Sequence, residues 1–326
     1  MLEQGGRKRD QDRSTPNAPM TPSVTNARSS APRYSGYRKN WEPIRIWKER
    51  ASRSISKPIR YAAARMILLD GPMGSELSRR AVDTASPLWS AAALVDAPEL
   101  VREIHASYAD AGATHHRTNT FRARPRTAGD DWERLARLAV RLARGSHRVV
   151  LGSVGPIEDC YRPDLAPPDD VARREHAELA RVLVDEGVDA LICETFPSAR
   201  EAAIATAACA RTGKETWVSL TAGPNGDLMT PRAMGDAARA CAGEGASAVL
   251  VNCVAASDTL PYVEALARVH ARVGVYANAS RWNEPPIDDA SYVACARLWL
   301  AAGASIVGSC CGTSASTIRA LATLRS

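Results

Sequence analysis

The chain has 326 residues, of which 45% are hydrophobic and 24% are charged, a composition typical of a water-soluble globular protein. Its formal net charge of +6 is uneven, because residues 1–60 hold 14 Lys and Arg against 5 Asp and Glu, which leaves a net charge of −3 for the rest. A mildly acidic folded part argues against nucleic-acid binding, and no run approaches the ~18 apolar residues of a membrane-spanning helix.

The first 60 residues differ from the rest in composition as well as in charge. They are rich in Arg, Ser, Pro and Asn, and they contain no apolar core of a secretory signal. We therefore expect a disordered basic extension over residues 1–60 and a folded domain over residues 61–326. Without a secretory signal the expected compartment is the cytoplasm, where the eight cysteines stay reduced.

From Met66 onward, short β-branched or apolar runs alternate with longer stretches of helical pattern. The predicted strands cover residues 66–69, 113–117, 149–152, 190–193, 216–220, 248–251, 273–276 and 305–307. The predicted helices cover residues 98–111, 131–143, 169–186, 199–211, 231–243, 260–272, 289–301 and 313–324. Glycine follows several of these helices and suits the left-handed end of a helix that turns into a strand.

Eight strand–helix units in about 260 residues predict a (β/α)8 barrel of the TIM type, an α/β fold. A doubly wound open sheet is the competing α/β fold, but its usual six strands would leave two of these units over. We therefore expect the barrel. In such a barrel the active site is built from the loops that follow the carboxyl ends of the strands.

Polar and cysteine side chains recur at these strand ends. They are Asp70, Thr118, Asn119, Ser153, Glu194, Cys253, Cys310 and Cys311. The three cysteines end the sixth and eighth strands, two places on one rim that can converge. Three thiolates form a soft ligand set that prefers zinc, and they leave a fourth tetrahedral position open for a substrate thiol. From spacing alone, unrelated buried cysteines and a redox-active pair of Cys310 and Cys311 are the alternatives.

Six phrases of the sequence carry a family resemblance. They are DGPMGSEL at 70–77, TNTF at 118–121, GSVGP at 152–156, CETFPS at 193–198, VNC at 251–253 and GSCCGT at 308–313. In this order they resemble the homocysteine S-methyltransferase family, which includes betaine- and S-methylmethionine-dependent enzymes and the homocysteine-binding module of cobalamin-dependent methionine synthase. The resemblance runs from residue 66 to the C-terminus and does not cover residues 1–60.

The resemblance implies a role for each of the residues at the strand ends. The implied zinc ligands are Cys253, Cys310 and Cys311. The acidic residues implied to hold the ammonium group of the acceptor amino acid are Asp70 and Glu194. The implied polar pocket positions are Thr118, Asn119 and Ser153.

The reaction implied by the resemblance is methyl transfer from a positively charged donor, such as S-methylmethionine or S-adenosylmethionine, to the thiol of homocysteine, which gives methionine. Because zinc takes the place of the thiol proton, no general base is needed at the attack. The expected partners are therefore homocysteine and a small methyl donor, with no nucleic acid bound by the barrel and no membrane. No oligomeric state follows from the sequence.

Several positions depart from the family pattern. Pro72 stands where a glycine is usual, and the stretches at 157–168 and 281–288 are shorter than in most relatives. Because rim loops determine the second substrate, the identity of the donor stays open. Two alternative functions follow: a degenerate barrel that binds zinc or an amino acid without methyl transfer, and a thiol-redox protein that uses Cys310 and Cys311.

Two adjacent histidines, His115 and His116, lie in the second predicted strand and could suggest a metal site. Neighbouring residues of a strand point to opposite faces, so at most one of them points into the barrel. We expect packing roles for both. Trp89 lies near a pocket position of the family, and core packing is its alternative role.

A chain that starts at Met66 should fold and keep its activity, because the family resemblance and the strand–helix pattern both begin there. Thermal unfolding and methyl transfer, compared between the full chain and the shortened chain, test this boundary. Loss of folding or of turnover in the shortened chain would show that the extension belongs to the working enzyme.

Overall fold

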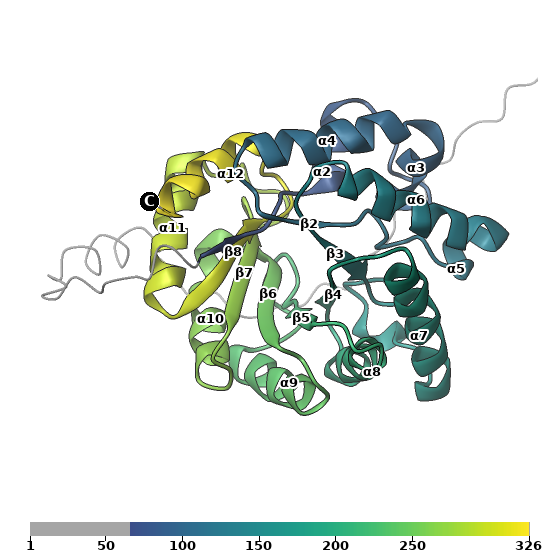
Figure 1. Cartoon of the computed structure of the whole chain (residues 1–326). Coiled ribbons are helices and arrows are strands. Elements are labelled where there is room, and N and C mark those ends of the chain that lie inside the picture. The colour runs from purple at the N-terminus through teal and green to yellow at the C-terminus, as the bar shows by residue number, and fades with distance from the viewer. Residues whose placement is uncertain (1–65, 326) are drawn as a thin grey trace, which may run out of the picture. The chain divides into compact units, whose positions relative to one another are not determined.

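The computed structural model describes residues 66–325, whose eight parallel strands form one sheet that curves into a barrel (Figure 1). The strands are β1 (Ile67–Leu68), β2 (His115–Arg117), β3 (Val149–Val154), β4 (Ala190–Phe196), β5 (Thr216–Leu220), β6 (Ala248–Ala255), β7 (Val273–Asn278) and β8 (Ala304–Ser309). Neighbours follow the chain order from β2 to β8, and β1 pairs with β8. The expected (β/α)8 barrel is confirmed, and the predicted extension of residues 1–60 lies outside the described residues.

Closure of the barrel between β1 and β2 depends on backbone contacts at the ends of these two short strands. Leu69 forms an isolated parallel bridge with His115, and the Asp70 amide donates to the His115 carbonyl at 3.0 Å. The Thr114 amide also donates to the Leu68 carbonyl at 2.8 Å. These contacts close the ring and hold Asp70 at a fixed place on the carboxyl-terminal rim.

Helices cover the outside of the strands, as Figure 1 shows. The predicted helices correspond to α4 (Pro98–Asp110), α6 (Trp132–Arg144), α7 (Asp169–Asp185), α8 (Ala199–Ala210), α9 (Pro231–Gly243), α10 (Leu260–Ala267), α11 (Asp289–Ala301) and α12 (Ala315–Ala322). The short helices α2 (Met73–Arg79), α3 (Ala93–Asp96) and α5 (Pro125–Ala128) escape the sequence prediction, because so few residues show no clear helical period. None of the described helices is long and apolar enough to cross a membrane.

Two predicted helices are too long. Helix α10 ends at Ala267 instead of residue 272, because the following residues form the turn into β7, where the Arg272 amide donates to the His270 ring at 3.0 Å. Helix α12 begins at Ala315 instead of residue 313, because Ser314 caps it in a reciprocal capping box with Thr317.

Five strands, β3, β4, β6, β7 and β8, extend further toward the rim than predicted, and two of them carry a bulge there. The register of β4 against β5 shifts between Cys193 and Phe196, and that of β6 against β7 shifts between Asn252 and Ala255. Within β6, Cys253 has a φ of 53°, in the left-handed region that residues other than glycine rarely adopt. A bulge turns a side chain out of the regular alternation. The sequence placed Glu194 and Cys253 just after two predicted strands. In the structure they lie within strands, Glu194 in β4 and Cys253 in β6.

Large apolar side chains fill the barrel below the rim. One buried cluster inside the ring of strands contains Leu151, Ile192, Trp217, Leu250 and Ile306. A second, larger cluster lies between the strands and the covering helices. The barrel is therefore a packed core, and a ligand site is expected at its carboxyl-terminal rim.

The two adjacent histidines point to opposite sides of β2, as expected, and His116 lies in a group with Asp70 and His105 whose ligand atoms are within 4.8 Å of one another. The His115 ring stacks on Trp217 with centroids 5.6 Å apart, and the buried His116 ring lies against His105 of α4, with their Nδ1 atoms 3.4 Å apart. The Nε2 atoms of His105 and His116 are buried without a hydrogen-bond partner among the described residues. Burial lowers the pKa of His105 to about 4 and that of His116 to about 3, so both rings are neutral in the folded protein at neutral pH.

The free energy of unfolding should fall as the pH drops from 6.5 toward about 4. Over this range His105 and His116 take up protons in the unfolded chain but stay neutral in the folded protein. Urea unfolding at several pH values measures this slope. The variant His116→Gln should weaken it, and His147→Asn, at an exposed histidine, should leave it unchanged. A stability that stays constant over this range would contradict the burial of neutral rings.

Candidate active site

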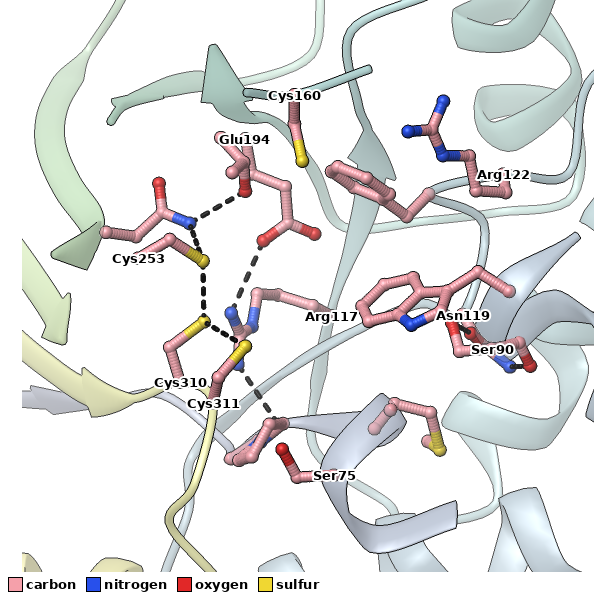
Figure 2. Close-up of a pocket in the computed structure, with 18 of the residues that line it drawn as sticks. Ser75, Ser90, Arg117, Asn119, Arg122, Cys160, Glu194, Cys253, Cys310 and Cys311 are labelled. Carbon is pink, nitrogen blue, oxygen red and sulfur yellow. Dashed lines mark hydrogen bonds and ion pairs between the residues drawn. The ribbon is translucent and has the colours of Figure 1, made fainter. Parts of the chain in front are cut away.

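A cavity of about 620 Å³ opens at the carboxyl-terminal rim of the barrel (Figure 2). The expected site residues that line it are Asp70, Thr118, Asn119, Glu194, Cys253, Cys310 and Cys311. Ser153, the remaining expected residue, is buried behind the wall and donates a hydrogen bond to Glu194. The fold thus gathers residues from the ends of six strands at one cavity.

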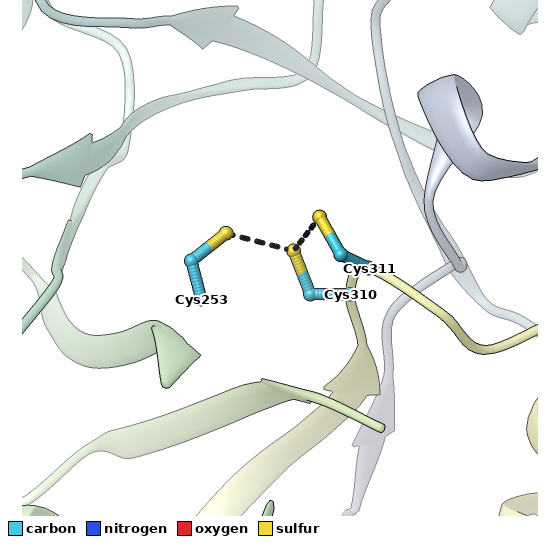
Figure 3. A group of neighbouring side chains, drawn as sticks. All are labelled: Cys253, Cys310 and Cys311. Carbon is cyan, nitrogen blue, oxygen red and sulfur yellow. Dashed lines mark hydrogen bonds between the residues drawn. The ribbon is translucent and has the colours of Figure 1, made fainter. Parts of the chain in front are cut away.

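Three thiols form the centre of this site (Figure 3). The Sγ atoms of Cys253 and Cys310 are 2.9 Å apart, those of Cys310 and Cys311 are 3.9 Å apart, and all three lie within 4.8 Å of one another. Cys253 reaches the group through the bulge in β6, and its Sγ accepts a hydrogen bond from the Asn252 amide at 3.4 Å. The geometry therefore offers three sulfur ligands that a metal ion could bind from the cavity.

The turn after β8 presents Cys310 and Cys311 to the cavity. The Cys310 amide donates to the Ala277 carbonyl of β7 at 2.8 Å, and the Thr313 hydroxyl donates to the Cys310 carbonyl at 2.7 Å. Gly312 follows with a φ of 82°, which a residue with a side chain would adopt only under strain. The phrase GSCCGT is therefore a rigid turn as well as a source of thiols.

The pKa values of Cys253 and Cys311 are shifted in opposite directions. Hydrogen bonding with Cys310 and Cys311, together with burial, raises the pKa of Cys253 well above its usual value. Hydrogen bonds from Cys253 and Cys310 lower the pKa of Cys311. A thiolate at Cys311, stabilised by its neighbours, is the state that a soft cation would bind.

Arg117, which no sequence pattern indicated as a site residue, ends β2 and lies between the two expected acidic residues. Its Nε donates to Asp70 Oδ1 at 2.7 Å, and its Nη1 lies 3.3 Å from Glu194 Oε2. Its Nη2 donates to the backbone carbonyls of Gly71 and Ser309 at 3.1 and 3.3 Å. Burial alone would lower the pKa of Arg117, but the two carboxylates raise it, so the guanidinium is charged.

Glu194 is bound by three donors at the base of the cavity. They are the hydroxyls of Ser153 and Tyr276 and the Nη1 of Arg117. Burial raises the pKa of Glu194 above its ordinary value, although Arg117 and Ser153 act in the opposite direction. Tyr276, another residue that the sequence analysis missed, also carries the Arg117 guanidinium over its ring at 4.4 Å.

Thr118 and Asn119 line the wall, but their polar groups are bound by other parts of the protein. The Thr118 hydroxyl accepts from the Ser153 amide at 2.9 Å. The Asn119 amide donates to the Ser90 carbonyl at 2.8 Å, and its oxygen accepts from the Ser90 hydroxyl at 2.7 Å. These contacts hold the loop after β2 in place, which gives both residues a structural role at the cavity.

Aromatic rings form the outer wall of the cavity. Trp89 and Phe121 meet edge to face with centroids 5.7 Å apart, and Tyr161 and Trp282 do so at 5.2 Å. Tyr161 and Trp282 belong to the two loops that the sequence analysis found short, so these loops still reach the cavity. Trp89 lines the cavity, the first of the two roles that the sequence left open for it. The sequence offered no signal for the other pair, because their contact joins two distant loops.

The departures in the first loop also fit the structure. Pro72 has a φ of −78°, close to the angle that its ring imposes, so proline does not disturb this turn. Gly71 and Gly74 are needed for packing, because a Cβ at either would lie within 2.5 Å of the Tyr108 or Trp89 ring. The loop is therefore compatible with an intact cavity.

The chain matches a known family over nearly all of its described length. The model of the family described as homocysteine S-methyltransferase matches residues 67–324. The homocysteine S-methyltransferase of Escherichia coli strain K12 is 31% identical over 296 residues, which cover 78% of this chain and 94% of that protein. The selenocysteine methyltransferase of Astragalus bisulcatus is 24% identical and covers 80% of this chain and 93% of its own.

Solved structures agree with this match. The homocysteine methyltransferase MmuM from Escherichia coli, in its metallated form, superposes with a TM-score of 0.68 at 28% identity, over 86% of this chain and 99% of that one. Its oxidized form superposes with a TM-score of 0.69 at 30% identity, over 80% and 96%. The chain described here belongs to the homocysteine S-methyltransferase family and is a methyltransferase.

Proposed function

We propose that this chain is a zinc-dependent enzyme that moves a methyl group from a small, positively charged donor to the thiol of homocysteine, which gives methionine. The observation that carries the proposal is the group of three sulfur atoms within 4.8 Å of one another at the base of an open cavity. An acidic pair and an aromatic wall adjoin the sulfurs in the same cavity. A cytoplasmic location stays a prediction.

The three thiols fit a catalytic zinc ion by chemistry and by number. With Zn–S bonds of about 2.3 Å, the sulfurs of a tetrahedral site lie roughly 3.8 Å apart, which the observed group can accommodate. Three protein ligands leave one position open, as in catalytic sites. Cys253, Cys310 and Cys311 would hold the zinc ion, which would lower the pKa of a substrate thiol and so favour the thiolate, the form that can attack a methyl group.

The chain's own residues can orient the acceptor. The polar end of the acceptor would lie near Asp70, Arg117 and Glu194, which are buried and held by hydrogen bonds. Such preorganised groups position a substrate without moving during the reaction. The roles of Thr118, Asn119 and Ser153 are to fix the wall and Glu194, as their hydrogen bonds indicate.

The aromatic wall suits a donor that carries a positive charge. A sulfonium or quaternary ammonium group gains electrostatic energy over the face of Trp, Tyr or Phe. Trp282 is 55% exposed, and an ion pair of its neighbour Arg281 with Asp258 at 2.6 Å holds its loop. S-methylmethionine and S-adenosylmethionine both carry such a sulfonium group. The wall therefore supports a cationic donor without distinguishing between these two.

Substitution of one thiol should abolish stoichiometric zinc binding. Substitution of a residue that hydrogen-bonds to a metal ligand lowers metal affinity about 10- to 100-fold. Loss of the ligand itself in Cys253→Ser should therefore lower zinc affinity by more than that. Zinc titration followed by metal analysis measures the effect, and Cys241→Ser, at a buried cysteine outside the cavity, is the matched control. Stoichiometric zinc in Cys253→Ser with full methyl transfer would contradict the site. A reversible Cys310–Cys311 disulfide in protein that binds no metal would favour the thiol-redox alternative.

Methionine should form from homocysteine and at least one cationic donor when the metal-loaded protein is tested with S-methylmethionine, S-adenosylmethionine and betaine. The variant Trp282→Ala should raise the KM for that donor by about 2- to 5-fold with little change in kcat, the effect of one exposed cation–π contact. Leu298→Ala, at an exposed apolar residue of α11, is the control. No methionine from any donor would favour the degenerate barrel.

A further inference from the structure

Arg117 introduces a positive charge at the place where the family resemblance expects a substrate ammonium group. Its side chain is 10% exposed and lines the cavity. Asp70 receives both the Nε and the backbone amide of Arg117, at 2.7 and 3.1 Å. One of the two acidic residues is thus already paired with a cation that belongs to the protein.

The second acidic residue has little capacity left for an ammonium group. Glu194 already accepts from Arg117, Ser153 and Tyr276, and a carboxylate offers about four acceptor sites. An ammonium group at the remaining acceptor position of Glu194 would lie beside the Arg117 guanidinium, whose Nη1 is 3.3 Å from Glu194 Oε2. Two positive charges so close together repel each other in a buried site. The acidic pair alone therefore does not make this end of the cavity an ammonium site.

Arg117 itself offers a hydrogen-bond donor to an anion. Arg117 has five N–H donors. Its Nε donates to the Asp70 carboxylate, its Nη2 group lies in reach of the carbonyls of Asp70, Gly71 and Ser309, and its Nη1 donates to Glu194. One Nη1 proton therefore has no partner among the described residues. The stack on Tyr276 at 4.4 Å fixes the plane of the guanidinium. A carboxylate that accepts this proton would gain a charge-assisted hydrogen bond with little loss of side-chain freedom.

Arg117 lies close enough to the three thiols for a short thiol substrate to reach both. Its Nη2 donates to the carbonyl of Ser309, the residue that directly precedes Cys310, so the guanidinium lies beside the sulfur group. Arg122, the other arginine that lines the cavity, is directed toward the carbonyl of Glu158, to which it donates at 2.8 Å. Arg117 is thus the cation next to the thiols, and Figure 2 shows the two arginines apart.

We propose that Arg117 makes the carboxylate, not the ammonium group, the polar group by which this enzyme recognises its thiol acceptor. Short mercaptocarboxylates without an amino group are then acceptors in addition to homocysteine. The inference rests on the proposed thiol methyl transfer and names the chemical class of the acceptor in the same cavity.

Three thiols that differ in one group each test the proposal on the wild-type enzyme. They are homocysteine, 4-mercaptobutyrate, which lacks the amino group, and 3-amino-1-propanethiol, which lacks the carboxylate. We expect kcat/KM for 4-mercaptobutyrate to stay within about threefold of homocysteine. For the aminothiol it should fall about 10- to 100-fold, the usual effect of losing a charge-assisted hydrogen bond. A wild-type enzyme that prefers the aminothiol to 4-mercaptobutyrate would overturn the proposal.

The variant Arg117→Gln should remove the preference for 4-mercaptobutyrate over the aminothiol. Arg272→Gln is the matched control, because Arg272 also pairs with a carboxylate, Glu215, and lies over a ring, that of Trp217 at 4.8 Å, but does not line the cavity. A folded Arg117→Gln that loses all three acceptors by the same factor would overturn the proposal, because Arg117 would then have a purely structural role.

Calorimetry with methylated products separates this inference from the proposed function, because it needs neither turnover nor a donor. 4-(Methylthio)butyrate and methionine should bind the wild-type protein, and 3-(methylthio)propylamine should bind at least tenfold more weakly. This result in a protein that methylates no thiol would support the carboxylate site while the proposed function fails. Tighter binding of the amine than of 4-(methylthio)butyrate would overturn the inference even in an active methyltransferase.

Discussion

The site depends on one local feature of the barrel, the bulge of β6 that places Cys253 against Cys310. A regular strand would alternate its side chains between the core and the helices, and Cys253 would follow that alternation. The register shift between Asn252 and Ala255 and the left-handed backbone of Cys253 bring its sulfur to 2.9 Å from that of Cys310. The hydrogen bonds of the turn after β8 fix the other two sulfurs. Two strands of a rigid ring thus hold three thiols for one metal ion.

Charge balance is the second constraint on the cavity. Two buried carboxylates without a partner would be costly, and Arg117 supplies one positive charge between them inside the protein. The same guanidinium lies next to the thiols, where it offsets the negative charge that three thiolates bring. Asp70, whose carboxylate already pairs with Arg117, does not need the acceptor to supply a cation. The outer aromatic wall is left to face a charged donor, so the two halves of the cavity differ in chemistry.

The sequence was enough to predict the barrel, because eight strand–helix units repeat with glycine at several of their junctions. It was also enough to name Asp70, Glu194 and the three cysteines as cavity residues, since each lies at a strand end. It could not show the bulges, because a register shift depends on pairing with the neighbouring strand. Arg117 and Tyr276 escaped attention for a similar reason: each lies in a strand, and its role depends on partners from distant strands. The contact of Tyr161 with Trp282 joins two loops that no local pattern connects.

X-ray absorption at the zinc edge tests the central claim most directly, because it counts the sulfur atoms around the metal. We expect three sulfur neighbours in zinc-loaded protein and four after addition of the acceptor thiol. The variant Cys253→Ser should lose this signal, because it should no longer hold stoichiometric zinc. Zinc surrounded by nitrogen and oxygen, or a sulfur count that the acceptor thiol does not change, would contradict the account.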